Sequence, residues 1–118
     1  MVWDFTCVDT LAPSHLNTAV SAAGAVAAEA EEHKRQKYTS LSGTYYFVPI
    51  AVETLGAVGE EAAMFLNELS HRITRVTKDA CSSQFLMQRL SVAVQRGNAA
   101  CVLGTVKSSD ALDELFYL

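Results

Sequence analysis

The chain has 118 residues, half of them hydrophobic, and carries 9 basic and 13 acidic side chains, so its formal charge is −4 at pH 7. This length suits one domain with a modest core, and no apolar run approaches the ~18 residues of a membrane span. The negative charge argues against a general nucleic-acid coat protein, and the N-terminus lacks the features of a secretory signal. We expect Cys7, Cys81 and Cys101 to be reduced core thiols of an intracellular protein, without metal-ligand spacing.

Residues 1–8, MVWDFTCV, predict the first strand, because β-branched and aromatic side chains dominate this stretch. The imperfect alternation of its apolar residues favours a strand that is buried on both faces. Asp4 lies inside this strand, where an acidic side chain is unfavourable without a partner. The stretch that follows, residues 10–21, is loop-like.

Residues 22–41, AAGAVAAEAEEHKRQKYTSL, predict the central helix, because they are rich in alanine and charged residues and include no proline. With a rotation of about 100° per residue, six residues share one narrow face. They are Ala23, Ala27, Ala30, Lys34, Tyr38 and Leu41. The small residues of this face place the helix close against a sheet. Lys34, in the middle of the face, must extend to solvent or pair with an acid, and Asp4 is the nearest unexplained acid upstream.

A second buried strand is predicted over 45–53, YYFVPIAVE, and Pro49 within it indicates an edge position or a bulge. Strand, crossover helix and strand imply a parallel pair with a right-handed connection. The sequence therefore predicts an α/β fold. A β-α-β core over 1–55 is followed by a helical extension of two or three helices over 56–118, and the two form one compact domain.

The C-terminal half has helical periodicity. The acidic pair at 60–61 has the charge that a helix N-terminus favours, and the serine pair at 82–83 is suited to cap a further helix. The glycine-asparagine pair at 97–98 predicts a stop or a kink. Periodicity does not choose between strand and helix for 99–106. We expect the apolar and aromatic residues 115–118 to dock on the body of the protein or on a partner.

Positive charge is concentrated between Leu69 and Lys107, where six basic residues stand against one acid, Asp79. Such a segment is suited to face the phosphates of DNA. The residues assigned to this contact are Arg72, Arg75, Lys78, Arg89 and Arg96. The alternative is that these side chains form ordinary solvated helix faces, or complement the helix dipole near a C-terminus.

The stretches WDFTCVDTL, EEHKRQKYTSL and YYFVPIAVETLGAVG resemble the restriction-like endonuclease module near the C-terminus of certain non-LTR retrotransposon polyproteins. Those modules belong to the PD-(D/E)XK nuclease superfamily. The later stretch FLMQRLSVAVQRGNAACVLGTV resembles the C-terminal end of reverse-transcriptase-type polyproteins from animal genomes. The resemblance covers most of the chain, and it implies a Mg²⁺-dependent enzyme that hydrolyses phosphodiester bonds of DNA in the nucleus.

In this family two acids on adjoining strands and a lysine build the Mg²⁺ site, and in the retrotransposon branch the lysine lies on the following helix in a K-x-x-K-Y pattern. Residues 34–38, KRQKY, match that pattern, and Asp4 matches the second acid. The resemblance implies that Asp4 binds Mg²⁺, which prefers oxygen ligands. It further implies that Lys34 orients the attacking water or stabilises charge on the phosphate, supported by Lys37 or Tyr38.

Two departures from the family pattern change what is expected of this chain. The family's first acid would lie upstream of Met1, and Thr6 stands where the D-x-K form has its lysine. We therefore expect a partial nuclease core, truncated at its N-terminus and inactive alone, that requires another polypeptide for the missing strands. The alternative is a small non-catalytic intracellular interaction domain, with Lys34 as a surface lysine and the aromatic C-terminus as a docking site.

Overall fold

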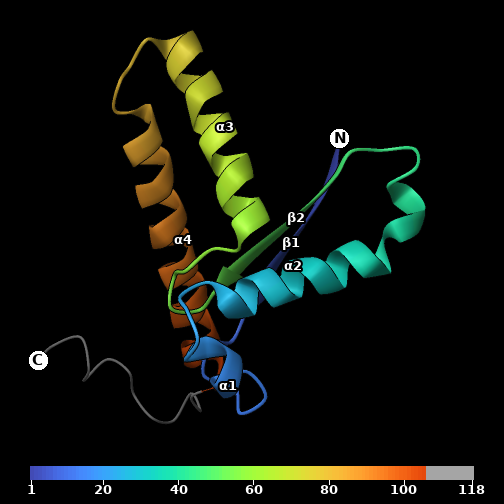
Figure 1. Ribbon diagram of the computed structural model, residues 1–118. Coiled ribbons are helices and arrows are strands. Elements are labelled where there is room, and N and C mark those ends of the chain that lie inside the picture. The colour runs from blue at the N-terminus through green and yellow to red at the C-terminus, as the bar shows by residue number, and fades with distance from the viewer. Residues whose placement is uncertain (106–118) are drawn as a thin grey trace, which may run out of the picture.

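The computed structural model describes residues 1–105 and shows a two-stranded sheet accompanied by helices (Figure 1). The elements in chain order are β1 Val2–Val8, α1 Leu16–Ala19, α2 Ala25–Lys37, a 3₁₀ turn Thr39–Leu41, β2 Phe47–Glu53, α3 Glu60–Thr77 and α4 Ser82–Thr105. This mixture of helices with a parallel strand pair confirms the predicted α/β fold. No helix within residues 1–105 combines the length and the apolar character that crossing a bilayer requires.

The sheet is a parallel pair, as the strand-helix-strand order predicted. β1 pairs with β2 in a register that sets Asp4 opposite Pro49 and Thr6 opposite Ala51. The crossover helix α2 packs against both strands. Within the described residues each strand has one neighbour, so Pro49 lies on an edge strand, as predicted for a residue without a backbone N–H.

The two faces of β1 differ, which corrects the prediction of a strand buried on both. Side chains alternate along a strand, and Asp4 reaches α2, so Trp3 and Phe5 point to the opposite face. Helix α3 packs against β2 on the sheet and leaves Trp3 60% and Phe5 47% exposed. The run of apolar residues in β1 therefore reflects an open face as well as a covered one.

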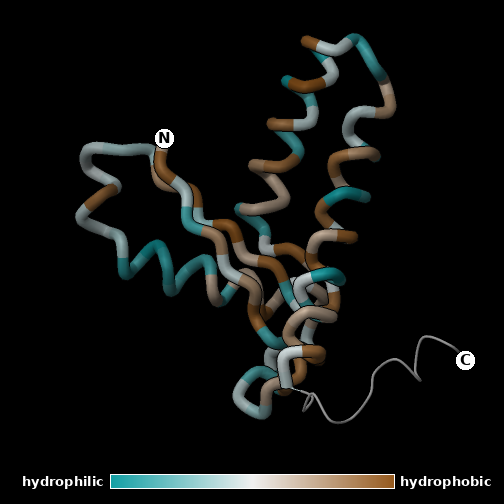
Figure 2. Tube along the Cα trace, turned by 180° about the vertical axis from the view of Figure 1, so that it is seen from behind, coloured by the Kyte–Doolittle hydropathy of each residue, from teal (hydrophilic) through white to brown (hydrophobic). Residues whose placement is uncertain are grey.

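The apolar core lies between α2, β2 and the first turns of α3. Its buried members are Val26, Ala27, Phe47, Val48, Ala51, Val52, Ala62 and Leu66. Ala27 and Ala51 have no exposed surface, so α2 lies close against the sheet, as its small residues predicted. Figure 2 shows the change along α2 from apolar residues near its start to hydrophilic residues near its end. The helix is shorter than the predicted 22–41, because Gly24, at φ 83°, precedes its first turn.

Helices α3 and α4 lie side by side as a hairpin that stands away from the sheet (Figure 1). The predicted stop at 97–98 is wrong, since α4 runs unbroken to Thr105, and the alternative of a kink there stays a prediction. Gly97 does not have a positive φ, and the Asn98 amide donates a hydrogen bond of 2.7 Å to the Thr54 carbonyl, which holds the middle of α4 on the body of the protein. Residues 99–105 are helical, which decides the open choice between strand and helix for this stretch.

The cysteines correct a further expectation. Cys7, Cys81 and Cys101 are free thiols, as predicted, but all three are exposed instead of belonging to the core. Cys7 lies on the open face of β1, and Cys81 precedes α4 at the tip of the hairpin. Apolar neighbours in the sequence indicated burial, but the open face of β1 and the one-sided packing of α4 leave these positions in solvent.

Candidate functional site

An ion pair joins β1 to the central helix. The Lys34 Nζ donates a hydrogen bond of 2.6 Å to Oδ2 of Asp4, across 30 residues of sequence. The side chains are 19% and 33% exposed, respectively, so both groups remain within reach of solvent. The strand supplies an acid on its α2-facing side and the helix supplies a lysine on its sheet-facing side, as predicted for this pair.

The other two predicted site residues lie beside this pair, where α2 ends. The Lys37 Nζ lies 5.2 Å from the centroid of the Tyr38 ring, a cation–π geometry. The Tyr38 ring in turn packs against Phe47 with centroids 5.2 Å apart and planes inclined by 54°. Packing on Phe47 positions the Tyr38 ring. Two lysines and a phenol at the C-terminal end of α2 therefore lie close to the Asp4 carboxylate on β1.

The basic groups around Asp4 lower the pKa of its carboxyl below the ordinary value. The hydrogen bond from Lys34 is the largest cause, and partial burial acts in the opposite direction. The charge of Lys34, the hydroxyl of Tyr38 and the charge of Lys37 lower the pKa further. Asp4 is therefore a carboxylate at neutral pH, and it lies in a locally positive environment that also favours an anion such as a phosphate.

A metal ion at this place would have one protein carboxylate. Within residues 1–105 no three histidine, cysteine, aspartate or glutamate side chains come together in a way that would hold a metal. Oδ2 of Asp4 already accepts from Lys34, so a single carboxylate would anchor Mg²⁺ while waters and substrate oxygens complete its coordination. The donor set present here fits a weak Mg²⁺ contact, and a tight site needs a further acid.

Three of the five predicted DNA contacts lie together. Arg72, Arg75 and Lys78 line one cleft of about 400 Å³ with Val76, at the C-terminal end of α3. Arg72 also donates from Nε to Oε1 of Glu68 at 2.7 Å, one turn earlier on the same helix. This cleft presents a compact cluster of positive charge on an exposed end of the hairpin.

The remaining two predicted contacts lie elsewhere, along α4. The Arg89 guanidinium lies 5.9 Å from the centroid of the Phe85 ring, and Arg96 is exposed two turns further along the helix. They share a helix face with apolar side chains, whereas the cluster on α3 is almost entirely basic. The five residues therefore belong to two surfaces of different chemistry.

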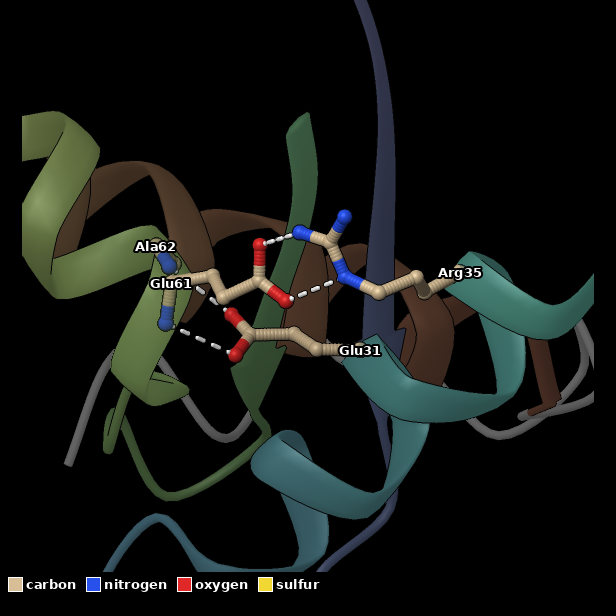
Figure 3. A network of polar contacts seen from close by, with 4 residues as sticks. All are labelled: Glu31, Arg35, Glu61 and Ala62. Carbon is tan, nitrogen blue, oxygen red and sulfur yellow. Dashed lines mark hydrogen bonds and ion pairs between the residues drawn. The ribbon is translucent and has the colours of Figure 1, made fainter. Parts of the chain in front are cut away.

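A buried carboxylate that is not among the residues predicted from the sequence connects α2 to α3. Glu31 is 2% exposed, and its two oxygens accept from the backbone N–H groups of Glu61 at 2.9 Å and Ala62 at 2.8 Å (Figure 3). The N-cap residue of α3 is Gly59, which has no side chain to satisfy these groups. That missing cap is the signal in the sequence that an acceptor must come from another element.

An ion pair covers this connection from outside. The Arg35 guanidinium binds the Glu61 carboxylate with both ends, through Nε to Oε1 at 2.9 Å and through a terminal nitrogen to Oε2 (Figure 3). Arg35 follows Glu31 by one turn of α2, so consecutive turns of α2 contact the first turn of α3. Glu31 and Arg35 thus fix the angle between the two helices.

Glu53 makes the equivalent connection at the start of α2. It ends β2, is 3% exposed, and accepts from the Ala27 N–H and from the Thr10 hydroxyl at 3.3 Å each. Glu31 and Glu53 are each fully engaged by groups of the fold itself, so neither is free to serve as the second acid of a metal site. Asp4 differs from both because its partner is a lysine side chain and the pair remains partly exposed to solvent.

No protein-family model, curated protein or solved structure matches this chain. The resemblance to a retrotransposon endonuclease module therefore stays a prediction. What the geometry adds is independent of any relative: Asp4, Lys34, Lys37 and Tyr38 are close together in space, although the first is 30 residues from the second in sequence.

Proposed function

We propose that this chain is part of a Mg²⁺-dependent DNA endonuclease of the retrotransposon type, in which Asp4 and Lys34 belong to the reaction centre. The observation that carries the proposal is the ion pair of 2.6 Å between a strand acid and a crossover-helix lysine, both within reach of solvent. The K-x-x-K-Y pattern of the family supports it, because Lys37 and Tyr38 lie beside the pair.

In this proposal the residues have separate tasks. Asp4 would hold Mg²⁺ through one carboxylate oxygen, and the bound ion would supply charge neutralisation on the phosphodiester and a more acidic water. Lys34 exchanges its contact with Asp4 for a phosphate oxygen or the attacking water, and its positive charge stabilises the charge that develops as the bond breaks. Lys37 adds positive potential. The Tyr38 ring, which packs against Phe47, forms one side of the site.

The basic side chains on the hairpin would hold the DNA. The cluster of Arg72, Arg75 and Lys78 is the stronger candidate, because three cations line one cleft and would together attract the phosphates of a DNA backbone. DNA as the substrate makes the nucleus the expected place of action. The single carboxylate at the centre implies a second acid from another polypeptide, and we propose that the chain alone is inactive.

Plasmid nicking tests this proposal. Supercoiled DNA in Mg²⁺ buffer is incubated with this chain, alone and together with a polypeptide that carries the upstream strands and first acid of the related modules. We expect nicking only in the second mixture, loss of nicking with Lys34→Ala, and full nicking with Gln36→Ala, an exposed neighbour on the same helix. No nicking by a mixture shown to form a folded complex, or unchanged nicking with Lys34→Ala, would contradict the proposed role.

A second candidate function, a non-catalytic interaction domain, has one observation in its favour. Helix α4 keeps large apolar side chains in solvent, among them Phe85 at 63% and Val92 at 56% exposed. Such a face is typical of a surface that is covered by a partner. The aromatic C-terminus, assigned to docking in the sequence analysis, lies outside the described residues.

A further inference from the structure

Helix α4 uses only one of its faces within the fold. Leu86, Leu90 and Val94 are half-buried on the side that meets α3, and Asn98 continues this row to its hydrogen bond with Thr54. Apart from Ser82 at its start, no residue of α4 is fully buried. A helix of 24 residues that packs on one side leaves an equally long face in solvent.

The exposed face has the spacing of a coiled-coil seam. Its residues follow one another at alternating intervals of four and three, which is the heptad pattern of a helix that packs along another helix. They are Phe85, Arg89, Val92, Arg96, Ala99 and Leu103. We call this set the α4 seam. All six are exposed, and Leu103 is 42% exposed in addition to the values given above for Phe85 and Val92.

Two arginines occupy equivalent positions in the α4 seam. Arg89 and Arg96 are seven residues apart, which places them about 10 Å from each other along one side of the helix. Helix α4 contains no acidic residue, and neither arginine forms an ion pair with any residue in the described range 1–105. The seam thus combines an apolar row with two positive charges that have no ion-pair partner among residues 1–105.

This charge pattern disfavours a parallel pairing with a second copy of the same helix. A parallel pair would set each arginine of one seam against the same arginine of the other, and like charges facing each other destabilise an interface. Double-stranded DNA would satisfy the arginines but would leave the three large apolar side chains, Phe85, Val92 and Leu103, without an apolar contact. An amphipathic helix with acidic residues at the matching positions would pair with the two arginines and also cover the apolar side chains.

We propose that the α4 seam docks an acidic amphipathic helix of another protein, whose glutamate or aspartate side chains face Arg89 and Arg96 and whose apolar side chains pack between Phe85, Val92 and Leu103. The stacking of Arg89 on Phe85 pre-orders one of the two arginines for this contact. This surface lies on α4, away from the Asp4–Lys34 pair, and the proposal does not depend on nuclease activity. It assigns Arg89 and Arg96 to a protein partner instead of to phosphate.

The experiment uses a designed probe, because the partner is unidentified. The probe is a fluorescent 24-residue helical peptide with leucine at one seam position and glutamate at the other in each heptad, and its counterpart has lysine in place of glutamate. Fluorescence anisotropy with the full chain, without DNA or Mg²⁺, measures binding. We expect the glutamate peptide to bind and the lysine peptide to bind at least ~10-fold more weakly.

Charge reversal then tests the two arginines. Arg89→Glu with Arg96→Glu should weaken binding of the glutamate peptide at least ~10-fold and strengthen binding of the lysine peptide. The control is Arg75→Glu with Lys78→Glu, which changes the net charge equally on α3 and should leave the preference for the glutamate peptide in place. Circular dichroism of both double variants confirms that the helices are retained.

Four outcomes would overturn the proposal. The first is no binding of the glutamate peptide, and the second is an equal loss in the control variant, which would show net charge as the only cause. The third is a fall in affinity for duplex DNA that is larger with the α4 pair than with the α3 pair. The fourth is binding of a free peptide of residues 106–118 with equal affinity, which would assign the seam to the chain's own tail.

Discussion

The half of the molecule formed by the sheet and α2 buries charged groups together with its core, whereas the hairpin of α3 and α4 buries one apolar face and leaves the rest in solvent. Glu31 and Glu53 are 2% and 3% exposed in the first half, each bound to backbone N–H groups or a hydroxyl. In α4, by contrast, Phe85 and Arg89 share an open face. The sheet and α2 therefore hold their buried side chains at fixed positions, whereas the hairpin exposes side chains that are accessible to a partner.

Three acids that cannot be told apart from the sequence have different bonding partners in the structure. Glu31 and Glu53 each serve the start of a helix and have no capacity left for a ligand. Asp4 instead binds the side chain of a lysine, and its carboxylate is 33% exposed. A carboxylate's partner, more than its burial, therefore decides whether it holds the fold together or belongs to a candidate site.

Glu31→Ala should cause the largest loss of folding stability in the part of the molecule formed by the sheet and α2. It removes the acceptor for two backbone N–H groups at the start of α3, and we expect the free energy of unfolding to fall by about 2–4 kcal/mol. Urea denaturation measures the change. Glu32→Ala is the control: this exposed neighbour accepts a hydrogen bond from the Gln36 side chain one turn later, and its loss should cost less than about 0.5 kcal/mol. Equal losses in the two variants would contradict the capping role of Glu31.

Gly59→Ala tests the same connection from the other side. A methyl group at Gly59 would overlap the carboxylate of Glu31, and we expect a loss of about 1–3 kcal/mol from this overpacking. Because the overlapping group is the Glu31 side chain, the loss should shrink to a few tenths of a kcal/mol when Gly59→Ala is made in the Glu31→Ala background. Additive losses in this double-mutant cycle would show that Gly59 is needed for another reason.

Gly97→Ala tests whether α4 is a regular helix at Gly97. Gly97 lies in the interior of α4 with no atom near the place of an added methyl group, so alanine should stabilise the helix by about 0.5–1 kcal/mol. Gly56→Ala is the contrasting variant, since Gly56 has φ 99° and open space around it, and it should destabilise the protein. Thermal unfolding followed by circular dichroism distinguishes the two. A destabilising Gly97→Ala would restore the break in the helix that the sequence suggested.

Lys34→Ala has the smallest expected effect on stability, below about 1 kcal/mol, because the ion pair is partly exposed. The pKa of Asp4 is lowered from 3.8 in the folded protein, so its stabilisation is present above pH 3.8 and is lost as the pH falls through the lowered value. Lys34→Ala should raise the pKa of Asp4 and flatten the pH dependence of stability in that acidic range. An NMR titration of the Asp4 carboxyl carbon measures the pKa directly. An unchanged pKa would show that Lys34 is not the main cause of the lowered pKa of Asp4.

Much of the fold could be predicted from local patterns. Alanine-rich composition marked the crossover helix, the flanking apolar runs marked the two strands, and the order of these elements fixed the parallel pair. The pairing of Asp4 with Lys34 was predictable for a physical reason, since an acid within a strand and a lysine on a sheet-facing helix side each need a partner. Each of these features is decided by one element and its nearest neighbour in the fold.

The errors come from properties that several elements decide together. The open face of β1 depends on where α3 packs, which the sequence of β1 does not contain. The continuation of α4 through Gly97 depends on the anchor that Asn98 finds on Thr54. The role of Glu31 required knowing that α2 and the start of α3 meet. The separation of Arg72, Arg75 and Lys78 from the two arginines of α4 likewise follows from helix faces.

The most direct test of the proposed reaction centre is an NMR titration of the full chain with Mg²⁺, observing the Asp4 carboxyl carbon. We predict a saturable shift of this signal with weak affinity, on the order of millimolar, because a single carboxylate would anchor the ion. In Asp4→Asn the side-chain carbonyl carbon at position 4 should not shift with Mg²⁺. In Asp9→Asn, which alters the exposed acid directly after β1, the shift of the Asp4 signal should be retained. Shifts confined to other exposed acids, with the Asp4 signal unmoved, would contradict a metal-binding role for Asp4.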